Sequence, residues 1–282
     1  MPELPEVQTV VTDLIAADLV GRRITAARVF WPRTIAAPAP AQFGRRIKDR
    51  TVSALGRRGK LIVIALSGGL TLLVHLRMSG RLVLGAAKAS PYLRVRLYLD
   101  DGRALDFIDT RKFGRFTLTA DPGPLLDRLG MEPLDRGFTP ARLADCLDGS
   151  TRALKALLLD QGVIVGIGNI YADEALWQAR LHPARPANSL SKPAVKALHR
   201  AIVDVLEQGI ANRGTTFSAG KAGFHSANRQ AGRNLSAIQV FRRTGQPCPR
   251  CDTPIARMIV GQRSTHYCPR CQPPSRAMRC TS

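Results

Sequence analysis

The chain has 282 residues, of which 45% are hydrophobic, and a formal net charge of +21 at pH 7. This size supports packed cores in two domains plus a small module, and no apolar run approaches the roughly 18 residues of a membrane span. So large an excess of Lys and Arg predicts a nucleic-acid partner. A basic membrane-surface protein is the alternative, but no long basic amphipathic helix supports it.

The chain begins MPELPEV, which puts a proline at position 2 beside a carboxylate. Removal of Met1 would leave Pro2 with a secondary amine, a nucleophile whose pKa of roughly 8 keeps part of it neutral at pH 7. Such an amine can attack a sugar carbon and form an iminium, and Glu3 lies next to it to move protons. The structural alternative is that the prolines shape the start of a helix, with Glu6 as a first-turn partner of its dipole.

Apolar residues at helical spacing predict a helix over 5–20 that ends at Gly21. Residues 24–118 are mainly strands, including a hairpin formed by 61–66 and 70–76 and an alternating strand over 93–99. This half is expected to be a two-layer β structure with the first helix packed against it.

Helical periodicity replaces this pattern after a change of composition at 123–140. Helices are predicted over 139–147, 150–159, 169–179 and 193–211, with a tight turn over 162–168 and Asn169 at or near a helix cap. The polar stretch 214–235 has no periodicity, and a loop of that length is functional or disordered.

Four cysteines, Cys248, Cys251, Cys268 and Cys271, form two C-x2-C pairs. This spacing predicts a tetrahedral zinc site on two knuckles. The zinc is expected to be structural, because four thiolates leave no position open for water. Two disulfides in a secreted domain are the alternative, although no signal peptide is expected. Cys146 and Cys280 receive no role.

Five motifs occur in a fixed order along nearly the whole chain: MPELPEV, HLRMSG at 75–80, DTRKFGR at 109–115, GIGNIYADE at 166–174 and CPRC…QRSTHYCPRC at 248–271. Together they resemble the formamidopyrimidine-DNA glycosylase (Fpg/Nei) family. The resemblance implies an α+β multidomain fold: an N-terminal β-sandwich with flanking helices, a helix–two-turns–helix domain and a C-terminal zinc-finger β-hairpin. It implies base-excision repair by a bifunctional glycosylase and AP lyase that removes oxidised purines, such as 8-oxoguanine and formamidopyrimidines, from duplex DNA.

The resemblance also implies a division of the chain. Residues 1–122 correspond to the catalytic β-sandwich domain, and 123–236 to the helix–two-turns–helix domain with a lesion-capping loop at about 214–236. Residues 237–272 correspond to the zinc finger, and 273–282 form a tail. One structural zinc, no organic cofactor, a duplex DNA partner with an oxidised purine or abasic site, a monomeric state and a cytoplasmic, nucleoid-associated location are expected.

Four residues take roles in the chemistry by resemblance. Pro2 attacks C1′ of the damaged nucleotide, and the iminium then permits β-elimination and δ-elimination. Glu3 is the acid/base, and Lys60 contacts phosphate or sugar, although an edge-strand charge would also explain a lysine there. Glu6 resembles a lesion-pocket residue, and its role as a helix-dipole partner stays open.

Six further residues contact DNA by resemblance. His75, Asn169 and Arg263 correspond to phosphate contacts, although helix capping alone would explain Asn169. Met78, Arg111 and Phe113 form a wedge that fills the gap left by the flipped nucleotide, with Arg111 bonded to the orphaned partner base; Met and Phe are otherwise core residues. His75 and Arg77 are expected to share one strand face.

The sequence departs from the family at several places. Leu4 favours the purine-specific branch, whereas Thr110 and Lys112 replace a more usual Pro and Arg. The segment 223–240 differs most, and Phe241 stands where tyrosine is usual, so the lesion range stays open. Two other classes also stay open: a non-catalytic binder of damaged or abasic DNA on the same scaffold, and a basic zinc-ribbon RNA-binding protein.

Overall fold

The computed structural model describes residues 1–85, 89–217, 224–227 and 230–275. Its internal contacts divide the chain into two compact units. Unit 1 consists of Met1–Arg128 and Gly209–Leu235, and unit 2 consists of Leu129–Gln208 and Ser236–Ser282. Part of the predicted loop over 214–235 lies outside the described residues, as does Cys280. Within the described ranges, no helix is both long and apolar enough to cross a membrane.

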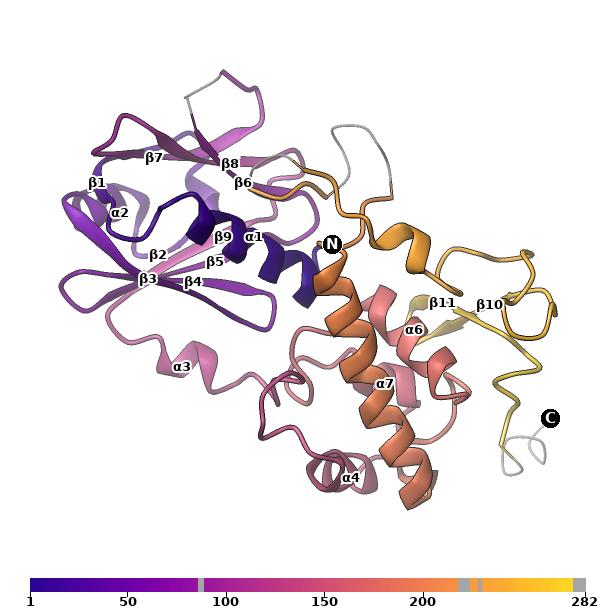
Figure 1. Cartoon of the computed structure of the whole chain (residues 1–282). Helices are drawn as coiled ribbons and strands as arrows, with labels where there is room; N and C mark the ends of the chain where they lie inside the picture. The colour runs from indigo at the N-terminus through magenta and orange to yellow at the C-terminus, as the bar shows by residue number, and fades with distance from the viewer. Residues whose placement is uncertain (86–88, 218–223, 228–229, 276–282) are drawn as a thin grey trace. The chain divides into compact units, whose positions relative to one another are not determined.

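A sheet of nine strands forms most of unit 1 (Figure 1). The strands lie in the order β2-β9-β5-β4-β3-β1-β7-β8-β6. Their bounds are β1 Arg23–Val29, β2 Ile35–Ala37, β3 Arg50–Arg58, β4 Leu61–Leu66, β5 Leu70–His75, β6 Gly80–Gly85, β7 Leu93–Leu99, β8 Ala104–Asp109 and β9 Arg115–Thr119. The predicted hairpin is therefore β4–β5, and the predicted alternating strand is β7.

The two ends of this sheet face each other across one hydrophobic core. Phe107 in β8 and Phe116 in β9 are distant in strand order, yet their ring centroids are 4.9 Å apart. A sheet brings such residues together when it folds over itself into two layers. Helices α1 (Leu4–Ala16) and α2 (Pro40–Ile47) bury their apolar side chains in the same core. The predicted β-sandwich with flanking helices is confirmed.

Helix α1 ends earlier than its apolar periodicity predicts. Asp18 has a positive φ of 53°, and the amide of Leu19 donates to the carbonyl of Leu14 while that of Asp18 donates to Ile15. This is a Schellman arrangement, which satisfies the last carbonyls of a helix through a residue in the left-handed region. The helix therefore ends at Ala16, before Gly21.

The remaining elements include the helical domain and a hairpin. Helix α3 (Gly123–Leu126) belongs to unit 1, and helix α7 (Lys192–Ala211) runs from unit 2 into unit 1. The other elements are α4 Pro140–Asp148, α5 Leu154–Leu158, α6 Asn169–Gln178, β10 Ala256–Val260, β11 Arg263–Tyr267 and the short 3-10 turns η1 Pro32–Thr34, η2 Ala187–Ser189 and η3 Asn234–Ala237. Strands β10 and β11 pair as an antiparallel hairpin.

The helix predicted over 150–159 is shorter than expected, because its first residues pair with another segment. The amide of Ala187 donates to the carbonyl of Arg152, and the amide of Leu154 donates to that of Arg185. Ala153 also forms an isolated bridge with Pro186. These long-range bonds hold 150–153 extended, so α5 begins at Leu154.

One stripe of helix α6 carries the hairpin β10–β11 in unit 2. Asn169, Asp173 and Trp177 are spaced by four residues, so they lie along the same side of the helix. The Asn169 side-chain amide donates to the Ser264 carbonyl (3.0 Å), and the Asp173 carboxylate accepts from the His266 amide (2.9 Å). The hairpin is therefore fixed to α6 by side chains as well as by any metal.

A fully buried lysine completes this contact. Lys155 Nζ lies 2.6 Å from Asp173 Oδ1, and both side chains are inaccessible to solvent. The same Nζ donates to the Ser264 carbonyl (3.0 Å) and to Thr265 Oγ1 (2.9 Å). The ammonium therefore neutralises a buried carboxylate and binds β11 at the same time, which is the geometry that a buried charge needs.

We expect Lys155→Met to destabilise unit 2 by about 3–5 kcal/mol, because it removes the ammonium from the buried Asp173 carboxylate and leaves only the His266 amide and ring beside it. The measurement is the free energy of unfolding by chemical denaturation, followed by Trp177 fluorescence. Arg152→Met is the matched control, since the Arg152–Asp160 pair lies on the surface (side chains 51% and 36% exposed) and such pairs contribute roughly 0–1 kcal/mol. If both variants lower the free energy of unfolding equally, the buried pair contributes no more stability than the surface pair.

Candidate functional site

The first residues of the chain are buried at the start of α1. Pro2 is buried, and the Glu3 and Glu6 side chains are only 3% and 1% exposed. Glu3 is the N-cap residue, and its amide donates to Glu6 Oε2 (2.8 Å). Glu6 therefore satisfies an amide that lies outside the helical hydrogen-bond ladder.

Glu6 has a second partner far along the chain. Its Oε1 accepts the amide of Thr215 (2.8 Å). Gly214 has a φ of 79°, and a Cβ there would lie 2.9 Å from Glu6 Cγ, so the approach requires glycine. The Glu6 carboxylate thus joins the start of α1 to the segment that begins the loop predicted over 214–235.

The described part of that loop closes on itself at its base. Asn212 donates through its side-chain amide to Asn234 Oδ1 (3.0 Å), and Asn234 donates in turn to Thr215 Oγ1 (3.0 Å). The Gly232 amide donates to Thr216 Oγ1 (2.9 Å). The base of the loop is thereby fixed next to Glu6.

Lys60 and His75 lie close together at one end of the β4–β5 hairpin. Lys60 is 7% exposed and precedes Leu61, the register partner of His75. The pKa of His75 is lowered to about 4, first by burial and then by the positive charges of Arg77 and Lys60. His75 is therefore neutral at pH 7.

A hydrogen bond selects the tautomer of this histidine. The Arg77 amide donates to His75 Nδ1 (3.0 Å), so the ring proton is on Nε2, which can donate. Arg77 has a φ of 55° and lies beyond the end of β5 at His75. The prediction that His75 and Arg77 share a strand face is wrong, because the strand alternation stops at this turn.

The three predicted wedge residues lie on two adjacent segments, 76–80 and 109–114, which we call the wedge turns. Gly80 pairs with Asp109 in the β6–β8 ladder. Met78 and Phe113 are 45% and 47% exposed, so neither is a core residue. The Arg111 guanidinium lies 4.9 Å from the centre of the Phe113 ring. The structure brings two exposed apolar side chains and one guanidinium together on unit 1.

Asn169 and Arg263 lie near each other in unit 2. Gly168 is the N-cap of α6 and Asn169 is the first helical residue, so capping does not account for Asn169. Its side chain instead donates to Ser264, the neighbour of Arg263. Arg263 is exposed at the start of β11. Asn169 and Arg263 therefore both lie beside Ser264, and an exposed guanidinium suits an anionic ligand.

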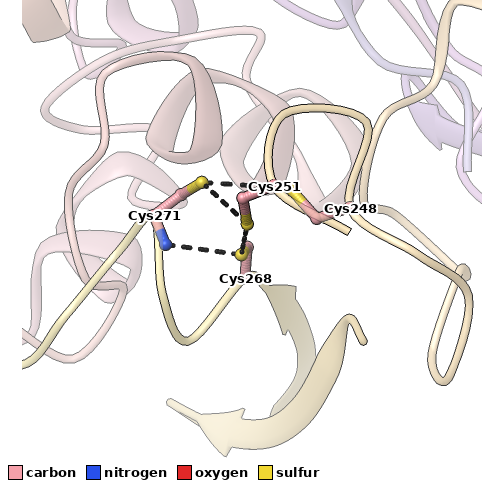
Figure 2. Close-up of side chains that lie close together, drawn as sticks. All are labelled: Cys248, Cys251, Cys268 and Cys271. Atoms are coloured by element: carbon pink, nitrogen blue, oxygen red, sulfur yellow. Dashed lines mark hydrogen bonds between the residues drawn. The ribbon is translucent and has the colours of Figure 1, made fainter. Parts of the chain in front are cut away.

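The four predicted zinc ligands form one cluster (Figure 2), in which the sulfur atoms all lie within 4.8 Å of one another. Cys251 Sγ lies 3.4 Å from Cys268 Sγ and 3.5 Å from Cys271 Sγ. A tetrahedral zinc with bonds of about 2.3 Å separates its sulfurs by roughly 3.8 Å. The four thiols therefore fit one structural zinc ion, and a set of four sulfurs gives a closed site.

Unit 2 supports this cluster from the side of α6. The Trp177 ring packs with Cys248 and Cys268, and the Arg250 guanidinium lies 3.7 Å from the ring centre. Gln272 accepts the Cys268 amide (2.9 Å) and donates to the Leu181 carbonyl (2.9 Å). Bonds of this kind orient metal ligands from outside the coordination shell.

The buried charged residues that the sequence reasoning missed include Lys155, Asp173 and Glu174 in unit 2 and Asp109 in unit 1. Glu174 accepts the amides of Gln239, Val240 and Phe241, although burial raises the pKa of its carboxyl. The sequence did contain a signal that Asp173 and Glu174 are buried, since these two adjacent acids interrupt the otherwise apolar run from 170 to 177. Nothing in that run indicates their partners.

We expect the His75 ring to titrate near pH 4 and to carry its proton on Nε2 at neutral pH, because burial and two cations oppose its charge. NMR of the imidazole nitrogens checks both statements. Because the folded pKa lies below the ordinary value, the unfolded chain takes up the proton first as the pH falls. His75 should therefore lower the free energy of unfolding as the pH falls from 6.5 to 4. An ordinary pKa near 6.5 would contradict the assignment.

We expect one zinc per chain, and its removal should loosen the hairpin β10–β11 while leaving the sheet of unit 1 folded. The chain has two tryptophans, so a Trp31→Phe variant makes Trp177 the sole fluorescent reporter of the cluster. Cys248→Ser should lose the metal in elemental analysis, whereas Cys146→Ser should keep it. Simultaneous loss of the Trp177 signal and of the sheet signal in circular dichroism would contradict this modular behaviour.

Three family models match the chain in order. The formamidopyrimidine-DNA glycosylase N-terminal domain matches residues 1–116, and the formamidopyrimidine-DNA glycosylase H2TH domain matches 129–220. A zinc finger found in FPG and IleRS matches 245–274. The three modules predicted from the motifs are thus confirmed.

Curated relatives are similar over their whole length. The formamidopyrimidine-DNA glycosylase of Protochlamydia amoebophila is 46% identical over 268 residues, which cover 94% of this chain and 97% of that protein. That of Roseiflexus sp. is 48% identical over 272 residues, covering 95% and 98%.

Solved structures agree with these relatives. The MutM (Fpg) protein from Thermus thermophilus has a TM-score of 0.87 and 37% identity, covering 97% of this chain and 100% of that one. The complex of Lactococcus lactis Fpg with DNA containing an abasic site has a TM-score of 0.88 and 30% identity, covering 96% and 99%. From its motifs, its three modules and these relatives, the chain belongs to the formamidopyrimidine-DNA glycosylase family.

Proposed function

We propose that this protein is a base-excision DNA glycosylase with AP lyase activity, which removes oxidised purines from duplex DNA through the amine of Pro2. The observation that carries the proposal is the buried start of α1, where Pro2 and Glu3 precede the helix and only Met1 is largely exposed (46%). Support comes from the Lactococcus lactis enzyme, which is solved with abasic-site, Fapy-dG and oxidised-pyrimidine DNA.

The environment of Pro2 favours a reactive amine once Met1 has been removed. Burial disfavours the charged ammonium, and the partial positive charge at the N-terminus of α1 acts in the same direction. Both effects favour the neutral amine, whose lone pair can attack carbon. The negative charge of Glu3 acts in the opposite direction, because it favours the charged ammonium. Glu3 would also hold the amine close and accept its proton.

The chemical steps follow from this amine. Its lone pair attacks C1′ as the bond from C1′ to the base breaks, and the base leaves with a proton. Opening of the sugar ring gives an iminium between Pro2 and C1′, with Glu3 as the acid/base for ring oxygen and amine. The iminium withdraws electrons, so a C2′ proton is lost and the 3′ phosphate leaves by β-elimination. A second elimination releases the 5′ phosphate, and water frees the amine.

The remaining site residues are assigned to binding. Neutral His75 donates from Nε2 to a phosphate, and Lys60 contacts phosphate or sugar; Asn169 and Arg263 bind phosphates from unit 2. The exposed side chains of Met78 and Phe113 replace the flipped nucleotide, and Arg111 bonds to the orphaned base. Glu6 is assigned to the lesion pocket, and both of its carboxylate oxygens accept backbone amides. The zinc holds the finger rigid and takes no part in the steps.

The domain assignment belongs to the same proposal. Residues 1–122 would form the catalytic domain, 123–236 the helix–two-turns–helix domain with the lesion-capping loop, 237–272 the zinc finger and 273–282 a tail. The protein would act as a monomer, because one lesion needs one active site. Its DNA substrate would be the nucleoid in the cytoplasm.

The lesion range depends on a part of the chain that differs from the family pattern. Phe241 replaces a usual tyrosine and lacks the hydroxyl that could bind phosphate. Its ring is 7% exposed and packs edge-on against His266 (5.2 Å), so it serves the core of unit 2. The segments 218–223 and 228–229 of the predicted capping loop lie outside the described residues.

The alternative is a non-catalytic binder of damaged DNA on the same scaffold. It requires only that Met1 is retained, because an acylated Pro2 nitrogen is not a nucleophile. Intact mass spectrometry of the purified protein distinguishes the two forms directly.

We expect borohydride to trap the protein covalently on duplex DNA with one 8-oxoguanine opposite cytosine, because reduction converts the iminium to a stable amine. Pro2→Gly should lose most of the adduct, and Glu3→Gln should bind this DNA but release little base. Arg263→Ala is the control, since it should weaken binding and reduce the salt dependence without changing the adduct formed at saturation. If an adduct forms only with DNA that carries an abasic site, the protein is a lyase that prefers a base other than 8-oxoguanine. Tight binding without an adduct on either DNA would favour the non-catalytic form.

A further inference from the structure

One buried carboxylate lies beneath both wedge turns of unit 1. Asp109, the last residue of β8, is 1% exposed. Its Oδ1 accepts the Ser79 hydroxyl and the Arg111 amide (3.1 Å), and its Oδ2 accepts the Gly114 amide (2.8 Å). The carboxylate thus holds Ser79 from one wedge turn and Arg111 and Gly114 from the other.

The Arg111 backbone is fixed with respect to both turns. Its amide is shared between Asp109 Oδ1 and Ser79 Oγ, each at 3.1 Å. The Asp109 carbonyl is held in turn by Nε of the buried Arg94 (2.8 Å). A shared donor of this kind links the position of Arg111 to the turn that carries Met78.

The packing below the turns leaves little freedom. A Cβ on Gly80 would lie 2.7 Å from the Phe107 ring, and a Cβ on Gly114 would lie closer still to the other edge of the same ring. Both approaches are far inside contact range, so the two turns lie directly on Phe107 through their glycines. The HLRMSG and DTRKFGR motifs therefore meet at one aromatic ring and one carboxylate.

The tip of the second wedge turn has its own support. Lys112 has a φ of 60°, and its ammonium lies 4.1 Å from the centre of the Trp31 ring. A cation over an indole face is an attractive contact. This contact supports a turn that has Thr110 in place of the conformationally restricted proline usual in the family.

We infer that Asp109 is a positioning residue, which fixes Arg111 relative to Met78 and Phe113 before DNA is bound and so sets the preference for the base opposite the lesion. The inference rests on the proposed role of Arg111 as the group that bonds to that base. An arginine whose backbone is already fixed has no backbone ordering cost on binding, and a displaced arginine loses its bonds to the correct base first. Asp109 acts through Arg111 and does not itself touch DNA.

Asp109→Asn tests this with almost no change of shape. The ionised carboxylate is an acceptor only, whereas an amide turns an NH2 group toward one of the backbone donors. Asp106→Asn is the matched control, because Asp106 is a buried carboxylate of the same strand (6% exposed) whose oxygens pair with Arg96 at 2.6 and 2.7 Å. Ser79→Ala is a milder second variant that removes only the shared hydroxyl.

The experiment measures dissociation constants of the full-length, zinc-containing protein for duplexes with a tetrahydrofuran abasic analogue opposite cytosine or adenine. The dissociation constant for the adenine duplex divided by that for the cytosine duplex reports the preference for cytosine opposite the lesion. This measurement needs neither base release nor lyase chemistry. We expect Asp109→Asn to reduce the ratio by about tenfold, because Arg111 then loses its fixed position and with it bonds that distinguish cytosine from adenine. Ser79→Ala should reduce it less and add little in the double variant, whereas Asp106→Asn should keep the wild-type ratio.

Each outcome bears on a different statement. A wild type that does not bind the analogue would overturn the proposed function, and an unchanged ratio in Arg111→Ala would remove the role of Arg111. If Arg111→Ala abolishes the preference but Asp109→Asn keeps it, the inference is wrong. If Asp109→Asn does not fold, Ser79→Ala decides: a wild-type ratio in that variant overturns the inference, and a reduced ratio supports it.

Discussion

Buried carboxylates that accept backbone amides hold the functional segments of this protein in place. A carboxylate removed from water must regain its hydrogen bonds, and a segment that supplies several amides satisfies this requirement at once. Glu6 binds the segment after α7, Asp109 binds the two wedge turns, and Glu174 binds residues 239–241. In each case the carboxylate is on a helix or strand and the bound segment is a turn or loop.

This use of acids affects the charge of the protein surface. Lys and Arg outnumber Asp and Glu by 42 to 21, and several of the acids are inside the two units, where they bind amides or buried cations. The basic residues are then left in excess at the surface, where they can attract phosphate. Burial of acids therefore orders the turns and also makes the surface more positive than the composition alone implies.

The zinc-bearing hairpin is held by two separate constraints. The four thiols fix the knuckles, whereas Lys155 and Asp173 fix strand β11 on helix α6. The metal site acts on β11 at its end, where the ligand Cys268 follows Tyr267. The buried ion pair holds the same strand at Ser264 and Thr265, and Ser264 links it to Asn169 and therefore to the neighbouring Arg263.

Motif and spacing by themselves determined the family, the zinc ligands and the β4–β5 hairpin. These features depend on neighbours in sequence or on residue type, so local patterns are sufficient to read them. Only the tertiary structure decided that α5 starts at Leu154, that Arg77 leaves the strand, and that Asp109 and Lys155 meet partners from distant segments. Periodicity indicates which side chains are buried, but the amide or ion that a buried charge meets is set by which segments the fold brings together.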